Sequence, residues 1–194
     1  MLKRTGGGSF GGYWVFPGGR VDPEDADELA TAVREAKEES GIDLDSASFV
    51  RLSHWQPPIM EVKRFSTWFF LARAPHLHDV EIDDGEIVDH AWVSPTEMLA
   101  RRDAGEIELA PPTFVSLYIL SAHSNVESAL TEARAAEPTQ FLTQLVRLDD
   151  ERGKRGFTIW QGDVAYDKPS MVDEAGGRHR VEITTSPWVY VRDF

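Results

Sequence analysis

The amino-acid sequence predicts an α/β or α+β sandwich with a mixed sheet. Short apolar runs typical of strands alternate with segments in which apolar residues recur at helical spacing. Helices interspersed among strands in this way pack as layers around one core. The chain has 194 residues, of which 41% are hydrophobic, so it can bury a sizeable core.

The first expected helix covers residues 25–40 and carries the most informative pattern in the chain. Asp25 is expected to cap its N-terminus, with Glu28 as the capping-box partner, and Gly41 is expected to end it. Its buried face is expected to consist of Leu29, Val33 and Ala36. One face of this helix should therefore pack on a sheet and leave the other for chemistry.

The remaining elements follow from apolar periodicity and from turn residues. After the end of a strand at residues 1–4, further strands are expected at residues 13–16, 48–52, 64–72 and 87–93, and helices at 94–102, 112–123 and 125–136. Ser94 and Pro95 form a helix start, as N-cap and first helical residue. The end of the chain is rich in β-structure, at residues 141–148 and 157–160 and in two runs within 180–191. We therefore expect a core at 1–123 and an extension at 124–194 that packs on it.

Composition excludes several classes of function. The formal net charge is −13, so broad binding to nucleic-acid backbones is not expected. The chain has no cysteine, which excludes disulfides, thiolate zinc sites and a cysteine nucleophile. No apolar run reaches membrane-spanning length and no secretory signal opens the chain, so a cytoplasmic location without membrane contact is expected.

Three glutamates in the first helix indicate a metal site. Glu35, Glu38 and Glu39 stand at i, i+3 and i+4, so their carboxylates share one helical face. Like charges at this spacing destabilise a helix unless something neutralises them, and hard divalent cations prefer oxygen ligands. The preceding Gly18-Gly19 turn allows the backbone to approach a metal or a phosphate closely. Taken without this turn, the same glutamates would be read as a solvated acidic face.

The segment resembles the Nudix box. Arg34-Glu35-Ala36-Lys37-Glu38-Glu39-Ser40-Gly41-Ile42 is similar to its second half, and Phe16-Pro17-Gly18-Gly19-Arg20-Val21 to its entry. The stretch from Gly19 to Arg34 is one residue longer than the usual spacing. The first Glu of the box is replaced by Asp25 when counted forward from Gly19, and by Ala26 when counted back from Arg34.

The resemblance extends over nearly the whole chain, but it is weaker outside the box. It resembles a branch of the superfamily that includes peroxisomal coenzyme A diphosphatases and bacterial proteins of unknown substrate. This part of the likeness rests on Arg64-Phe65, Trp92, Pro111-Pro112-Thr113, Trp160-Gln161-Gly162-Asp163 and Arg178-His179-Arg180. The resemblance implies a Nudix-type α/β/α sandwich and hydrolysis of the diphosphate bond of a nucleoside-diphosphate compound, of the coenzyme A or the ADP-ribose and dinucleotide type.

The resemblance also implies roles for particular residues. Glu35, Glu38 and Glu39 would serve catalysis and face a common solvated cleft. Glu35 and Glu39 would bind Mg²⁺ or Mn²⁺, Glu38 would bind it too or help to place the water, and the Gly18 carbonyl would complete the shell. Arg34 would pair with a neighbouring glutamate and fix its rotamer. A further acid is expected from the loop at 79–89, for which we favour Glu86 over Asp83, Asp84 and Asp89. The candidates for substrate binding are Arg4, Arg64 and Trp55, the last from a loop at 55–58 where its ring would stack on a base.

Two alternatives stay open. The first is a Nudix-fold protein that binds a ligand or regulates without turnover. An isomerase of the same fold that acts on an allylic diphosphate is disfavoured, because resemblance to that family would require a catalytic cysteine and the chain has none. The second concerns the start of the chain, where the fold normally has one more strand and part of another. Either the start is truncated or the tail fills the gap, within the chain or across a homodimer.

Overall fold

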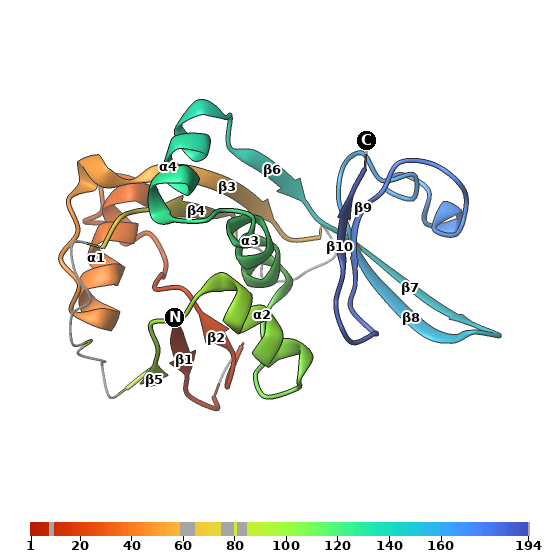
Figure 1. Cartoon of the computed structure of the whole chain (residues 1–194), viewed down its shortest axis with the longest axis horizontal. Coiled ribbons are helices and arrows are strands. Elements are labelled where there is room, and N and C mark those ends of the chain that lie inside the picture. The colour runs from red at the N-terminus through yellow and green to blue at the C-terminus, as the bar shows by residue number, and fades with distance from the viewer. Residues whose placement is uncertain (8–9, 59–64, 75–79, 81–84, 194) are drawn as a thin grey trace. The chain divides into compact units, whose positions relative to one another are not determined.

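The structure is a computed structural model that describes residues 1–7, 10–58, 65–74, 80 and 85–193. Arg64, Asp83 and Asp84 lie outside these residues. Figure 1 labels the helices and strands. Contacts within the chain define two compact units, residues 1–52 with 68–138, and residues 53–67 with 139–194. None of the helices in the described part of the chain is long and apolar enough to cross a membrane.

The first unit contains a three-stranded antiparallel sheet in the order β2-β1-β5. Its strands are β1 (Leu2–Arg4), β2 (Trp14–Val15) and β5 (Ile87–His90). Leu2, Trp14 and Ile87 are its buried apolar side chains, each at most 3% exposed. The register shifts between Lys3 and Arg4, and an irregularity of this kind re-aims the side chains beside it.

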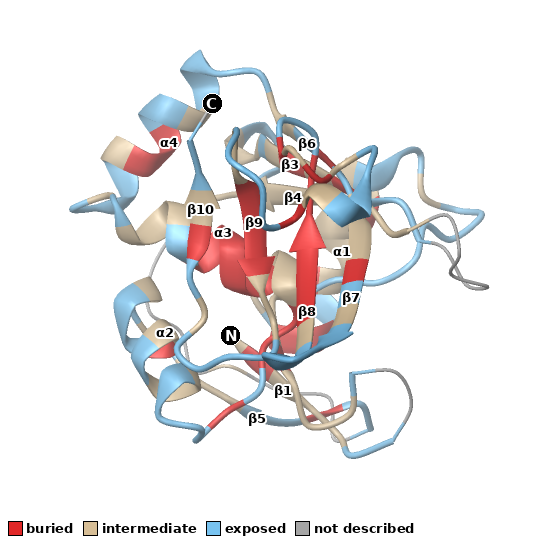
Figure 2. Cartoon of the chain, turned by 90° about the vertical axis from the view of Figure 1, so that its right-hand side faces the viewer, coloured by how far each residue is buried: buried red, intermediate tan, exposed pale blue. Residues whose placement is uncertain are grey.

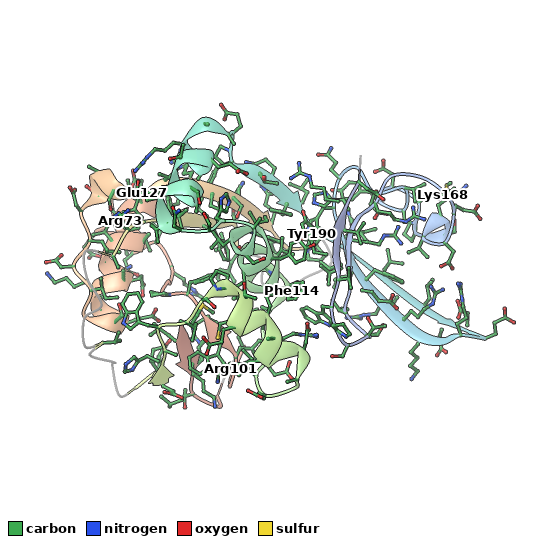
Figure 3. The ribbon with its side chains drawn as sticks, in the orientation of Figure 1. Arg73, Arg101, Phe114, Glu127, Lys168 and Tyr190 are labelled. Atoms are coloured by element: carbon green, nitrogen blue, oxygen red, sulfur yellow. The ribbon has the colours of Figure 1, made fainter. Side chains whose placement is uncertain are left out.

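The described residues of the same unit include four helices: α1 (Glu28–Ser40), α2 (Pro95–Asp103), α3 (Pro111–Ser121) and α4 (Val126–Ala135). The predicted cap of α2 is confirmed, because the Ser94 side chain accepts a hydrogen bond from the Glu97 N–H. Gly41 ends α1 in the left-handed conformation, at φ 68°, as expected. An ion pair joins Arg73 to Glu127 of α4, and the two side chains point toward one another in Figure 3.

The predicted start of α1 is wrong. The helix begins at Glu28, and Asp27 caps it by accepting a hydrogen bond from the Ala30 N–H at 2.9 Å. Asp25 and Asp27 are both good N-cap residues, so sequence preference alone does not choose between them. Asp25 is engaged elsewhere, with the side chains of Thr31 and Arg34.

A second three-stranded sheet has the order β4-β3-β6 and is mixed. A 3₁₀ turn (Ser46–Ser48) leads into β3 (Val50–Gln56), and β4 is Thr67–Leu71. β6 (Thr139–Leu142) pairs with the end of β3 in parallel, with Ser53 opposite Thr139 and Gln56 opposite Leu142. A strand from the predicted extension therefore adds to a strand from the predicted core.

The second unit is dominated by a four-stranded antiparallel sheet in the order β10-β9-β8-β7. Its strands are β7 (Gln144–Asp150), β8 (Gly153–Ile159), β9 (His179–Glu182) and β10 (Tyr190–Arg192), with a 3₁₀ turn at Pro169–Met171. Figure 2 shows buried residues in red along β8 and β9. Among the large apolar side chains of the tail, Trp160, Val181 and Tyr190 are buried, while Val164, Tyr166, Ile183, Trp188 and Val191 are half-buried.

An aromatic cluster forms part of the core of this unit and includes Trp55. The Trp55 ring stacks on Phe141 at 3.9 Å between centroids and meets Trp160 edge-on at 5.5 Å. Its indole N–H donates to the Ser53 hydroxyl, and the residue is only 4% exposed. The expectation that Trp55 lies in a loop is wrong, because β3 extends to Gln56 and turns this ring inward. A ring stacked on Phe141 in the core is not presented for stacking on a base.

A buried ion pair ties β9 to the turn after β8. Arg180 donates from Nε and Nη2 to the Asp163 carboxylate at 2.6 and 2.5 Å. Asp163 also accepts from the backbone N–H groups of Ala165 and His179. Burial by itself would raise the pKa of Asp163, but these hydrogen bonds and the guanidinium charge outweigh it and lower the pKa.

We expect Asp163→Asn to destabilise the protein by about 3–5 kcal/mol, because it leaves the Arg180 charge buried without a counter-ion. Urea unfolding followed by circular dichroism measures the change. Asp167→Asn is the matched control, since it removes the same charge from an exposed position. A loss for Asp163→Asn no larger than for Asp167→Asn would contradict the structural role of the pair.

His179 makes stability depend on pH. Burial lowers its pKa from 6.5, and its ring nitrogens contact the Gln161 carbonyl and the Tyr190 hydroxyl, both at 2.8 Å. The folded state therefore favours neutral imidazole, and the unfolded state takes up a proton first as the pH falls. The stabilisation is full above pH 6.5 and decreases below it, by up to about 1.4 kcal/mol per pH unit. Unfolding at pH 7.5 and 5.5 should show a smaller difference for His179→Gln than for the natural protein; equal differences would refute this assignment.

Candidate active site

The acidic face of α1 packs on the glycine turn that follows β2. The Gly18 backbone N–H donates to Glu39 Oε2 at 2.8 Å, and Glu39 is only 9% exposed. The pKa of Glu39 is raised to about 7, mainly by burial and also by the nearby carboxylates of Glu35 and Glu86, while the hydrogen bond from Gly18 and the charge of Arg4 act to lower it. Glu39 is therefore a buried carboxyl group on which the charges of two other carboxylates act.

The three glutamates of the box are not equally solvated, contrary to the expectation of one solvated cleft. The Glu35 side chain is 14% exposed and that of Glu38 is 58% exposed, while Glu39 is buried. The i, i+3, i+4 spacing brings the carboxylates to neighbouring places on the helix, but their depth depends on what covers each one. Here the glycine turn covers Glu35 and Glu39 and leaves Glu38 at the rim.

Gly19 lies close to the end of the Glu35 side chain, so a larger residue at this position would displace the Glu35 carboxylate. Gly18, in contrast, has open space where its Cβ would be, and its contribution is the N–H bonded to Glu39. The two adjacent glycines thus contact two different glutamates of α1, one through close approach and one through a hydrogen bond.

Arg34 joins the acidic groups around α1. It donates from Nη1 to Glu35 at 2.9 Å and to Glu38 at 2.8 Å, and from Nε and Nη2 to Asp25 at 3.1 and 2.8 Å. The hydrogen bond with Asp25 is the main reason that the pKa of Arg34 is raised, and the same bond holds the pKa of Asp25 far below its usual range. The pairing expected for Arg34 is therefore present in the structure.

The anchoring role of Asp25 was missed by sequence reasoning, which placed it at the helix cap. Its side chain is 7% exposed and accepts hydrogen bonds from Arg34, from the Thr31 hydroxyl and from the Asp22 N–H. The signal was present in the box, because Asp25 occupies the place of the missing first glutamate when counted forward from Gly19. The extra residue before α1 made that alignment ambiguous.

Glu86 and Arg4 add two charged side chains to the acidic residues around α1. Arg4 is the last residue of β1, and Glu86 directly precedes β5. Arg4 Nη2 donates to Glu86 Oε2 at 2.6 Å, at the point where the acidic loop enters β5. The charges of both residues act on Glu39, Arg4 lowering its pKa and Glu86 raising it. Glu86 thus acts electrostatically on a glutamate of the box helix, and Arg4 stands beside it. The predicted substrate contact of Arg64 falls outside the described residues.

The donor chemistry fits a hard divalent cation. Glu35, Glu39 and Glu86 offer oxygen donors, and the mutual effect of their charges on Glu39 is the kind of repulsion that a cation relieves. Within the described ranges, no three acidic or histidine side chains are yet arranged as a ligand set. The carboxylates instead pair with arginines of the protein: Glu35 and Glu38 accept hydrogen bonds from Arg34, and Glu86 accepts one from Arg4.

A cavity of about 330 Å³ lies elsewhere, in the second unit, and has no part in this group. Three arginines are among its lining residues, but each is already engaged. Arg155 pairs with Asp150 and Asp173, and Arg180 with Asp163. Arg178 donates to the backbone carbonyls of residues 174, 176 and 177. We therefore assign it no ligand.

The protein has a mixed α+β fold in which an acidic helix packs on a glycine turn. Comparisons with known proteins identify the class of protein to which this combination belongs. The crystal structure of a NUDIX hydrolase from Alicyclobacillus acidocaldarius is similar in fold, with a TM-score of 0.59 and 24% identity over 67% of this chain and 86% of that chain. The NUDIX domain family model matches residues 1–112, more than half of the chain, which therefore belongs to this family. A search of curated proteins finds no match.

The burial of Glu39 leads to a stability prediction. We expect Glu39→Gln to raise the melting temperature of the metal-free protein at pH 8 by roughly 2–4 °C or more, because it removes a buried charge and keeps an oxygen that can accept from the Gly18 N–H. Differential scanning calorimetry in the presence of a chelator measures the shift. Glu38→Gln is the control at the exposed neighbour and should change little. A lower melting temperature for Glu39→Gln would show that the ionised carboxylate stabilises the fold.

Proposed function

We propose that this chain is a divalent-metal-dependent diphosphatase that cleaves the diphosphate bond of a nucleoside-diphosphate compound. The observation that carries the proposal is the packing of Glu35 and Glu39 against the Gly18-Gly19 turn, within a chain of the NUDIX family. Burying two carboxylates beside each other is costly unless a cation joins them. Such an arrangement favours a site that is completed by a metal ion.

Glu35, Glu38 and Glu39 would hold Mg²⁺ or Mn²⁺, with the Gly18 carbonyl and Glu86 as further donors. The ion would neutralise charge on the diphosphate and lower the pKa of the attacking water. Arg34 is a positioning residue in this scheme. Its guanidinium holds Glu35 and Glu38 from one side and is itself fixed by Asp25, so the rotamers of the donor side chains are set before substrate arrives.

The reaction is the attack of water on one phosphorus of the diphosphate. A new bond forms between the water oxygen and phosphorus, the bridging phosphorus–oxygen bond breaks, and the water proton passes to a carboxylate of the site and then to solvent. The products are two phosphate monoesters or a monoester and phosphate. Resemblance outside the box supports a substrate of the coenzyme A type or of the ADP-ribose and dinucleotide type.

One observation favours a second candidate, a NUDIX protein that binds its ligand without turnover. Arg34 bonds to both Glu35 and Glu38, so two of the proposed donors are already engaged by a cation of the protein. Turnover requires that a metal ion share these carboxylates with Arg34. The two candidates differ in whether a bound nucleoside diphosphate is converted.

Hydrolysis of a panel of coenzyme A, ADP-ribose, NADH and dinucleoside polyphosphates with Mg²⁺ or Mn²⁺ tests the proposal. We expect at least one to be cleaved, and Glu39→Gln to lower kcat by orders of magnitude because it removes a metal donor. Products are measured by chromatography. Glu28→Gln is the matched control, because it removes an exposed carboxylate from the first turn of the same helix. If a compound of the panel binds but is not cleaved in the presence of either Mg²⁺ or Mn²⁺, the second candidate is favoured.

A further inference from the structure

A serine, a histidine and a glutamine form a hydrogen-bonded row across the sheet β4-β3-β6. His54 of β3 stands opposite Gln140 of β6 in the parallel pairing, and Ser66 directly precedes β4, the strand on the other side of β3. His54 Nδ1 lies 2.8 Å from Gln140 Oε1, and His54 Nε2 lies 2.6 Å from Ser66 Oγ. The three residues all belong to the second unit and have no part in the candidate active site.

The chemistry of this row determines which atom carries each hydrogen. Gln140 Oε1 is a carbonyl oxygen that can only accept, so Nδ1 carries the hydrogen of the neutral His54 ring. Nε2 is then the unprotonated nitrogen, and the Ser66 hydroxyl donates to it. A base within hydrogen-bond reach of a hydroxyl, itself oriented by a third group, is the arrangement that activates a serine as a nucleophile.

The row is open to solvent, and apolar side chains lie beside it. Ser66 and Gln140 are exposed, and His54 is half-buried. Alternate residues of a strand share a face, so Leu142, which is 43% exposed, lies on the same face as Gln140. Phe65, the neighbour of Ser66 in the chain, is 48% exposed. A small uncharged molecule can therefore reach the hydroxyl.

His179 gives a comparison within the same unit. Its Nδ1 also contacts a carbonyl oxygen, and its Nε2 contacts the Tyr190 hydroxyl. Both residues are buried, so this hydroxyl is closed to a substrate and its contacts serve the core. The same pattern at Ser66 leaves the hydroxyl accessible, and accessibility is what allows it a chemical role.

We propose that Ser66 is a nucleophile toward small carboxylic esters, with His54 as its general base and Gln140 as a positioning residue. Ser66 Oγ forms a bond to the acyl carbon while its proton passes to His54 Nε2. The bond from that carbon to the leaving oxygen breaks, and His54 gives the proton to the leaving oxygen. Water then attacks the acyl-serine, with the same nitrogen taking its proton, and the acid is released as Ser66 regains a proton. No step uses a metal ion, so the inference does not depend on the proposed function.

Reaction with p-nitrophenyl acetate in the presence of a chelator tests the proposal, because the chelator silences a metal-dependent diphosphatase. We expect mass spectrometry to find acetylation on the peptide that contains Ser66, and none on this peptide in Ser66→Ala. His54→Ala should slow the acetylation by roughly a hundredfold, which is the contribution of a general base. Ser128→Ala is the matched control, since this exposed serine donates to the Asn125 carbonyl and not to an imidazole.

Gln140 is tested by two substitutions that act in opposite directions. Gln140→Glu keeps an acceptor at Nδ1 and adds a charge that stabilises the imidazolium, so acetylation should quicken by roughly threefold to tenfold. Gln140→Leu removes the acceptor and should slow it. A residue that only joins β6 to β3 would leave the rate unchanged in both variants, provided that circular dichroism shows both to be folded.

The outcomes separate this inference from the proposed function. Acetylation of Ser66 no faster than that of Ser128, or at the natural rate in His54→Ala, overturns the inference even if the protein cleaves a diphosphate. Slower acetylation of Gln140→Glu overturns the positioning role of Gln140. Acetylation that requires both Ser66 and His54, in a protein that cleaves no compound of the diphosphate panel, supports this inference and overturns the proposed function.

Discussion

The hydrogen bond from the Gly18 N–H to the Glu39 carboxylate is the contact on which the rest of the site depends. It joins the turn after β2 to the last turn of α1 and keeps Glu39 beneath the backbone. Gly19 lies close to the Glu35 carboxylate, where a Cβ would displace that side chain. With these two contacts in place, Arg34 reaches Glu35 and Glu38 from the far side. The glycine turn and the glutamates of the helix therefore constitute one structural unit.

The free-energy balance of this unit explains why it contains so many arginine contacts. A buried carboxylate is unfavourable, and several of them close together are more so. The protein offsets this with two internal cations, Arg34 on the helix and Arg4 on β1. Each is held by an acidic partner that lies outside the triad of box glutamates, Asp25 for Arg34 and Glu86 for Arg4. These internal cations offset part of the repulsion among the carboxylates in the metal-free protein.

The sequence predicted most of the fold and indicated the glutamates of the candidate site, for reasons that differ between elements. The caps of α2 and α1 at Ser94 and Gly41 follow from local backbone preferences, which a sequence displays directly. The box glutamates could be recognised because ligand spacing on a helix is a local pattern. The family and the mixed α+β class, both predicted, are confirmed by the family match and the fold comparison.

What the sequence did not display depends on contacts between distant segments. Trp55 was placed in a loop because two prolines follow it, but pairing of β3 with β6 extends the strand and buries the ring on Phe141. The burial of Glu39 and the link between Arg4 and Glu86, 82 positions apart, are equally non-local. Asp25 was misassigned because two aspartates near the helix start have the same local preference, and only the reach of Arg34 distinguishes them.

The contacts of Arg34 have a consequence for how this sequence can diverge. All three guanidinium nitrogens are in use: Nε with Asp25, Nη1 with Glu35 and Glu38, and Nη2 with Asp25 and the Arg20 carbonyl. These acceptors lie on several sides of one planar group, and a lysine ammonium at the end of a flexible stem cannot reach them all together. A substitution at Asp25, Glu35 or Glu38 therefore removes an acceptor that Arg34 uses, and no other side chain can replace Arg34 in all its contacts. We expect these four positions to be constrained together in evolution.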